Sequence, residues 1–206
     1  LGDIPTALDH ALAAADLASR AGARSLAKAA WNNAVHLLVL RGEYRRAEAA
    51  IGRVGDAKEI ASATELVEAA TRLSLALATG ELRLASELNE VAASRSQESD
   101  SAPARWYDLV QVAYLLRANQ LQRAQSVALE SLSRIPETSD RNLLDRARLV
   151  AAEALVATKQ PMQAAGLVAA VLLGTLGKSR ELQAHAERVL GIMTVDAVDS
   201  TLHFAR

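Results

Sequence analysis

The chain is a series of alanine- and leucine-rich apolar stretches, separated at regular places by glycine, proline or short polar breaks. The alternation of apolar and polar residues expected of a β-strand is nowhere sustained. Alanine, leucine, glutamate, arginine and glutamine, which are favourable in helix interiors, dominate the apolar stretches and their flanks. The pattern therefore predicts an all-α fold. The breaks divide it into helices at about 5–20, 24–41, 43–54, 57–79, 81–95, 104–118, 120–134, 140–159, 161–176 and 179–193.

A six-residue pattern recurs along the chain. Each copy has a turn residue, a polar residue or proline, an apolar residue, two variable residues and then alanine. The copies are Gly2–Ala7, Gly42–Ala47, Gly80–Ala85, Asn119–Ala124 and Gln160–Ala165. Their first positions are 40, 38, 39 and 41 residues apart. A constant period of this length is the signature of a helical solenoid.

Each position of the pattern has a structural role between two packed helices. Glycine or asparagine can adopt the left-handed conformation that ends a helix, and an acidic residue suits the positive end of the next one. We expect the apolar third residue to face back into the helix pair. We expect the alanine to let the two helices approach closely, because a larger side chain would push them apart.

The clearest copy is preceded by Trp31-Asn32-Asn33-Ala34-Val35-His36-Leu37-Leu38 and followed by Ile51 and Val54. The spacing of its bulky residue, Gly-acidic-Tyr turn, alanine and later apolar residues resembles a tetratricopeptide repeat. Longer repeats of this kind resemble those of large bacterial transcription activators and of envelope-assembly proteins. The period exceeds the family's usual length of about 34 residues. Asp108 also stands where the first bulky residue belongs, and Asn89 occupies a usually apolar position.

The resemblance implies a right-handed α-α superhelix that forms a single domain over residues 1–206. The repeats would span approximately 1–22 (partial), 28–61, 66–99, 105–138 and 146–178, followed by a C-terminal capping helix and tail at 179–206. Because the first repeat would lack its first helix, we expect the chain to be a fragment of a larger protein.

Composition excludes several classes of function. Half of the residues are hydrophobic, and 23 Lys and Arg against 24 Asp and Glu leave a net charge of −1. This near neutrality argues against direct nucleic-acid binding, and no apolar stretch reaches the roughly 20 residues that span a membrane. The absence of cysteine excludes disulfides and cysteine nucleophiles. It leaves the compartment, cytoplasm or periplasm, open.

No arrangement of residues predicts catalysis, metal binding or cofactor binding. His10, His36, His185 and His203 lie on different predicted helices or tails, and none has a histidine four residues away for shared metal ligation. The chain also lacks a glycine-rich phosphate loop and a Gly-x-Ser-x-Gly turn. We therefore expect a protein that is not an enzyme and holds no cofactor.

The first helix of each tetratricopeptide pair lines a concave groove, where extended peptides or partner helices bind. The resemblance places Asn32, His36, Trp106, Leu109 and Arg117 on that groove. An asparagine there can bind a peptide backbone, and tryptophan and arginine are frequent among the residues that dominate interface energetics. The alternative for each residue is a spacer that packs neighbouring repeats.

The most direct interpretation is a non-catalytic scaffold that presents a helical groove to a protein or peptide partner. Two alternatives stay open: an effector- or inhibitor-sensing regulatory domain of a bacterial transcription activator, and a scaffold for secretion, pilus or flagellar-motor assembly. The apolar stretch at 195–204 would cap the solenoid or pack on a further repeat. An uncapped end would expose an apolar patch through which copies of the chain could self-associate.

Overall fold

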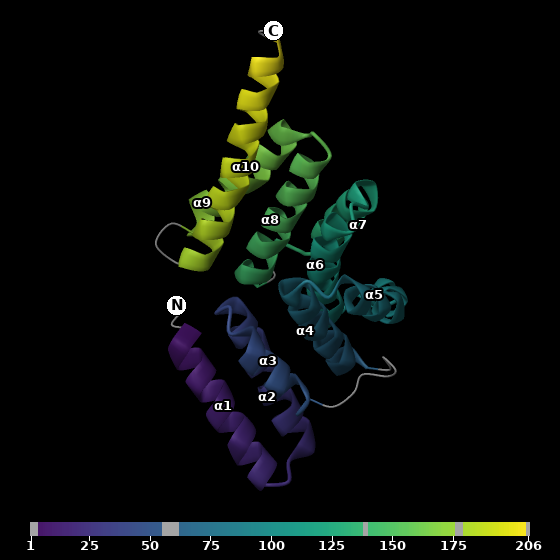
Figure 1. The fold of residues 1–206 in the computed structure, drawn as a ribbon, viewed down its shortest axis with the longest axis vertical. Helices are drawn as coiled ribbons and strands as arrows, with labels where there is room; N and C mark the ends of the chain where they lie inside the picture. Colours follow the sequence, from purple (N-terminus) through teal and green to yellow (C-terminus); the bar gives the residue numbers. More distant parts are fainter. Residues whose placement is uncertain (1–3, 55–61, 138–139, 176–178, 205–206) are drawn as a thin grey trace. The chain divides into compact units, whose positions relative to one another are not determined.

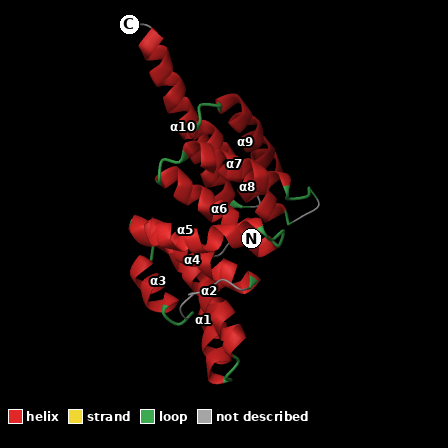
Figure 2. Ribbon diagram, turned by 90° about the vertical axis from the view of Figure 1, so that its right-hand side faces the viewer, coloured by secondary structure: helices red, strands yellow, loops and turns green. Residues whose placement is uncertain are grey.

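The computed structural model describes residues 4–54, 62–137, 140–175 and 179–204. These residues form ten α-helices and no strand (Figures 1 and 2). The prediction of an all-α fold is confirmed. In chain order the helices are α1 (Ile4–Arg20), α2 (Arg24–Leu40), α3 (Tyr44–Ile51), α4 (Ala63–Thr79), α5 (Leu82–Gln97), α6 (Ala102–Arg117), α7 (Leu121–Ser133), α8 (Arg141–Ala157), α9 (Pro161–Thr175) and α10 (Arg180–Phe204).

Helix α4 begins with a well-formed N-terminal cap at Ser62. The Ser62 hydroxyl accepts a hydrogen bond from the Glu65 amide at 3.4 Å, and the Glu65 carboxylate accepts one from the Ser62 amide at 2.8 Å. This reciprocal capping box fixes the first turn of the helix. The predicted start at residue 57 lies outside the described residues. At the other end of the chain, α10 continues to Phe204, beyond its predicted end at residue 193.

The chain divides into two compact units, which we call the N-terminal unit (Asp3–Tyr114) and the C-terminal unit (Leu115–Arg206). In the N-terminal unit α1 packs on α2, α2 on α3 and α4, and α4 on α5. In the C-terminal unit α7 packs on α8, and α8, α9 and α10 pack on one another. The extent of a single repeat domain over the whole chain stays a prediction.

Each unit has a core of branched apolar side chains and alanines. In the N-terminal unit the cluster is Leu8, Ala34, Val35, Leu38, Ala47, Ala50, Val54 and Leu75. In the C-terminal unit it is Leu149, Ala152, Leu155, Val156, Ala164, Val168, Val171, Leu182, Ala186 and Val189. The alanines let helix backbones approach, while leucine and valine supply most of the apolar area removed from water.

Five interhelical turns share one backbone geometry. The residues with positive φ are Gly22 (71°), Gly42 (74°), Gly80 (81°), Asn119 (56°) and Lys159 (63°). In every case the amide of the following residue donates to the carbonyl five residues earlier, as from Glu43 to Leu38 at 2.9 Å. This is the Schellman arrangement, which satisfies the last carbonyls of a helix.

The alanine five residues after each turn is buried. These residues are Ala27, Ala47, Ala85, Ala124 and Ala164. The predicted register is therefore wrong by one residue in the last copy, whose turn residue is Lys159 and whose buried alanine is Ala164 rather than Ala165. Pro161 explains the shift, because it occupies the first position of α9, where the missing amide hydrogen is not needed.

The first predicted copy is also wrong where the structure describes it. Ala7 is exposed, and the next residue, Leu8, is buried instead. The turn with the shared geometry is at Gly22, and the predicted turn residue Gly2 lies outside the described residues. The apolar third residue is not fully buried in any predicted copy. Ile4 and Leu121 are half-buried, whereas Tyr44, Leu82 and Met162 are 39%, 47% and 86% exposed.

Candidate functional site

Four of the five predicted groove residues belong to the N-terminal unit. Asn32 on α2 and Leu109 on α6 are buried, at 4% and 6% exposure. His36 on α2 and Trp106 on α6 are half-buried. Arg117 belongs to the C-terminal unit, where it is exposed at the end of α6.

His36 and Trp106 are in direct contact. Their ring centroids lie 5.3 Å apart and the ring planes are inclined at 82°, so the contact is edge-to-face. This arrangement brings a positive ring edge against a negative ring face and is favourable beyond the burial of area alone. Two residues from separate predicted repeats thus form one partly accessible aromatic pair.

Lys28, Asn32 and His36 follow one another at intervals of four residues along α2, so their side chains share one face of the helix. We call these three residues the α2 polar face. At one end of it, Lys28 Nζ lies 2.7 Å from Glu68 Oε1 on α4. At the other end, His36 contacts Trp106 on α6. The α2 polar face therefore joins three helices of the N-terminal unit.

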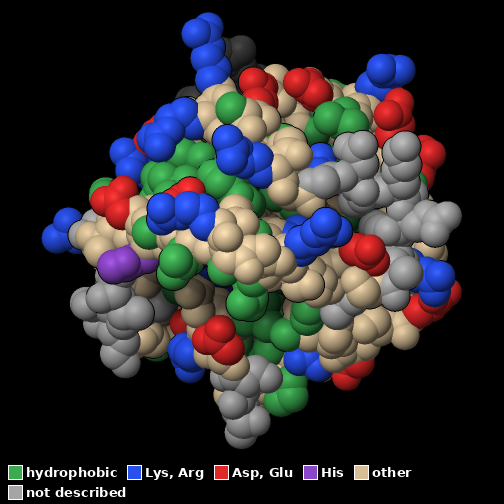
Figure 3. Space-filling model, turned by 90° about the horizontal axis from the view of Figure 1, so that it is seen from below, with side chains coloured by type: hydrophobic (Ala, Val, Ile, Leu, Met, Phe, Trp, Pro, Cys, Tyr) green, Lys and Arg blue, Asp and Glu red, His purple; other side chains and the backbone are tan. Residues whose placement is uncertain are grey.

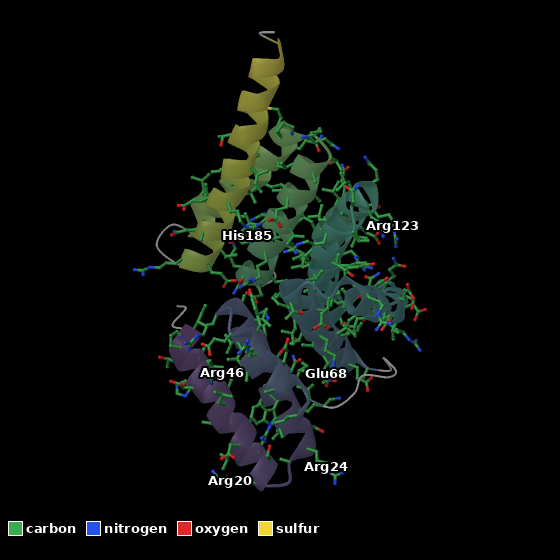
Figure 4. The ribbon with its side chains drawn as sticks, viewed as in Figure 1. Arg20, Arg24, Arg46, Glu68, Arg123 and His185 are labelled. Carbon is green, nitrogen blue, oxygen red and sulfur yellow. The ribbon has the colours of Figure 1, made fainter. Side chains whose placement is uncertain are left out.

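Three polar atoms on or beside this face are buried without hydrogen-bond partners in the described part of the chain. They are Asn32 Oδ1 and both carboxylate oxygens of Glu68. The Lys28–Glu68 contact meets the distance of an ion pair but not the geometry of a hydrogen bond. Glu68, labelled on α4 in Figure 4, is only 1% exposed. Such atoms are uncommon in folded proteins, and each calls for an explanation.

Two pairs of buried polar residues connect α5 and α6, the helix that carries Trp106. The Tyr107 hydroxyl donates to Asn89 Oδ1 at 3.2 Å. The Ser96 hydroxyl donates to Asp108 Oδ1, and it lies 3.1 Å from the carbonyl of Ala104. Asn89 and Asp108, which depart from the repeat pattern, are therefore each matched by a polar partner across the interface.

Burial, together with the neighbouring Asp108 and Tyr114, raises the pKa of the Tyr107 hydroxyl well above its ordinary value near 10. Tyr107 therefore remains a protonated donor at neutral pH. Since Tyr107 and Asp108 directly follow Trp106, their bonds to α5 fix the segment of α6 that presents the tryptophan. Sequence reasoning treated these polar residues as isolated departures. The signal that it missed was their compatible hydrogen-bonding chemistry.

The described residues offer little for other kinds of site. Among them, no group of three or more His, Asp or Glu side chains is arranged to hold a metal ion. None of the helices in the described ranges combines the length and apolar character of a membrane span. The chemistry of the α2 polar face is that of binding: an aromatic surface, an amide and a positioned ammonium group.

Comparisons with known proteins give no relative from which a role could be transferred. No protein-family model matches the chain, and no curated protein or solved structure is significantly similar to it.

Proposed function

We propose that the chain is a non-catalytic scaffold that binds a protein or peptide partner through the α2 polar face and Trp106. In this proposal the helix pairs are degenerate tetratricopeptide-like repeats, and they continue one another as a right-handed superhelix. The turns at Gly42, Gly80, Asn119 and Lys159, which are 38, 39 and 40 residues apart, and the buried alanine that follows each of them support the repeat interpretation.

The observation that carries the proposal is a juxtaposition. His36 lies on the same face of α2 as the buried Asn32, whose Oδ1 has no hydrogen-bond partner among the described residues, and it forms a partly accessible aromatic pair with Trp106 of α6. Tryptophan is enriched among the residues that dominate binding energy. A polar atom left unpaired in the interior costs about 1–3 kcal/mol. Departures from good packing and pairing concentrate at functional sites, so we assign this face to binding rather than to stability.

The position of α6 supports the same assignment. The bonds of Tyr107 and Asp108 to α5 hold this helix in place from its buried side. Trp106 is thereby held in a defined position before a partner arrives. Fixing a side chain in advance reduces the ordering cost of association and so raises affinity.

Affinity capture from native extract tests the proposal, with the whole chain as bait. A His36→Ala/Trp106→Ala variant should lose at least about nine-tenths of the captured partner, because truncation of a central interface residue commonly costs 2 kcal/mol or more. A matched control is Leu82→Ala/Leu84→Ala, which removes two exposed side chains of α5, 47% and 41% accessible. Circular dichroism of both variants would establish that the helices persist.

The control should retain its partner. Equal capture by the wild-type chain and the His36/Trp106 variant would contradict the assignment of the binding face. A selective loss in the Leu82/Leu84 variant would move the interface to the outer helix α5.

A further inference from the structure

The N-terminal unit contains an open cavity of about 480 Å³ where the end of α1, the start of α2 and the end of α3 meet. Its lining includes Arg24, Lys28 and Arg53 together with Ser19, Trp31 and Val54. Arg20 and Arg24 flank the turn between α1 and α2 in Figure 4. Figure 3 views the molecule from the side on which that turn lies in Figure 1 and shows basic side chains among apolar ones.

The charged groups of this cavity are all cationic, since no acidic residue of the described chain lines it. Neither Arg24 nor Arg53 forms an ion pair with a described residue. Arg24 and Arg53 at one opening create a positive potential that attracts anions, whereas the charge of Lys28 is balanced in part by Glu68.

Two contacts hold the basic side chains in position. The Arg53 guanidinium lies over the Trp31 ring, with Cζ 4.9 Å from the ring centroid, in a cation–π contact. Lys28 Nζ lies 2.7 Å from the buried Glu68 carboxylate. An ammonium group has three donors. Glu68 can therefore orient Lys28 while other donors of the same group remain for a ligand.

The start of α2 adds a third source of positive potential. The residue that precedes the helix, Ala23, supplies no side-chain acceptor to its first turn. The neighbouring Gly22 and Arg24 both line the cavity. The positive end of the dipole of a 17-residue helix therefore lies beside this site.

We propose that this cavity binds a phosphorylated small molecule, with its phosphate between Arg24, Lys28 and Arg53 and the rest of the ligand against Trp31 and Val54. A phosphate dianion has enough acceptors to use several cationic donors at once. The cavity is larger than a phosphate alone requires and lies within the roughly 300–1,000 Å³ typical of small-molecule sites. The site does not include the aromatic pair proposed to bind a macromolecular partner, although Lys28 belongs both to its lining and to the α2 polar face. It would add effector sensing to the scaffold.

Trp31 offers a direct test, because the chain has only two tryptophans. In a Trp106→Phe variant, Trp31 is the sole tryptophan, and its fluorescence reports on the cavity. We expect a saturable change with glucose 6-phosphate and with inorganic phosphate at constant ionic strength, and none with glucose. Calorimetric titration of the wild-type chain with glucose 6-phosphate should give the same affinity.

Arg24→Ala and Arg53→Ala should each weaken binding of glucose 6-phosphate about tenfold, as expected for loss of a charge-assisted hydrogen bond. Arg83→Ala is the matched control, since this exposed arginine pairs with Glu87 on α5 and should leave the affinity unchanged. The absence of saturation with both phosphate-bearing probes would overturn the proposal, as would unchanged affinity in both cavity variants. Binding of a phosphoserine peptide without binding of glucose 6-phosphate would also overturn it, in favour of a phosphorylated protein partner.

Discussion

Glu68 in the N-terminal unit and Asp145 in the C-terminal unit are both buried carboxylates, at 1% and 0% exposure, but their surroundings differ. Asp145 Oδ2 accepts from Arg141 at 3.0 Å, and Oδ1 accepts from Arg148 at 3.2 Å. One oxygen of Glu68 lies near Lys28, and the other has no partner in the described chain. Asp145 is thus a buried carboxylate with a hydrogen bond to each oxygen, whereas Glu68 is a buried carboxylate with one oxygen that can still accept a hydrogen bond.

The Asp145 network continues to the surface residue Glu137 and requires a glycine at position 174. Arg148 also donates to both carboxylate oxygens of Glu137, at 2.8 and 2.9 Å. Arg141 passes over Gly174 of α9, where a Cβ atom would lie 2.0 Å from its Nη2. The glycine therefore leaves the space that the guanidinium occupies. Glu68 has no comparable network among the described residues, because its one partner, Lys28, is partly exposed and lines a cavity.

The largest expected effect comes from Asp145→Asn. This variant keeps the size of the side chain but removes the charge that faces two guanidinium groups, one of which, Arg148, is only 11% exposed. We expect a loss of about 3 kcal/mol in the free energy of unfolding, because two charge-assisted hydrogen bonds to a buried carboxylate are lost. Urea denaturation measures this difference.

Glu68→Gln is the matched variant in the other unit and should change the free energy of unfolding by less than about 1 kcal/mol. Lys28 is 34% exposed and can be hydrated when its partner loses charge, so the pair resembles surface pairs in its energetics. Equal losses in the two variants would show that Glu68 is as structural as Asp145 and would remove the basis of the comparison.

The next prediction concerns packing, in which the two units should not differ. Ala85→Leu and Ala164→Leu should each destabilise the chain by about 1–3 kcal/mol, because both alanines are fully buried and a larger side chain overpacks the helix pair. Thermal denaturation provides the measurement. Ala165→Leu is the control for register and should have little effect, since Ala165 is only partly buried. The opposite order between positions 164 and 165 would restore the register predicted from the sequence.

Tyr107 predicts a pH dependence for the polar interface between α5 and α6. Burial raises the pKa of its hydroxyl in the folded chain, whereas the unfolded chain releases the proton near pH 10. The stability due to this group is therefore complete below pH 10 and falls by about 1.4 kcal/mol per pH unit above it. Tyr107→Phe should remove this decrease of about 1.4 kcal/mol per pH unit from the free energy of unfolding, as measured by denaturation between pH 9 and 11.

The smallest effect is expected at the turns. Lys159 adopts a left-handed conformation with φ of 63°, which is strained for a residue with a long side chain. Lys159→Gly should stabilise the chain by about 0.5–1 kcal/mol in urea denaturation. Asn119→Gly should give less, because asparagine tolerates this conformation better. A loss of stability in Lys159→Gly would indicate that the lysine side chain contributes contacts that outweigh the strain.

The sequence predicted the helices well because their signals are local. Glycine and proline breaks and capping residues act over one or two turns, and all ten helices of the described chain were found. The register of the last repeat was missed because a lysine, rather than a glycine, occupies the left-handed position. The break at Gly22 was predicted, but its likeness to the repeat turns was missed because Gly22 precedes the next glycine turn by only 20 residues, half of the period used to find the repeats.

The site was predictable only in part. Helical periodicity placed Asn32 and His36 on one face and singled out Trp106, but the contact between His36 and Trp106 depends on packing between distant helices. The burial of Asn32 and the pairing of Lys28 with Glu68 have the same origin. No local pattern identifies such contacts, because they are set by which helix faces meet. The cationic cavity was missed because its arginines come from separate helix ends.

The most direct test of the binding face is site-specific photo-crosslinking in native extract. A photoreactive phenylalanine derivative would replace Ala113, an exposed residue two helical turns beyond Trp106 on the same face of α6. The control position is Leu173 on α9, which is 78% exposed. The account predicts a crosslinked partner from position 113 that disappears with His36→Ala and no such product from position 173. Crosslinking from position 173 alone, or from position 113 regardless of His36, would contradict it.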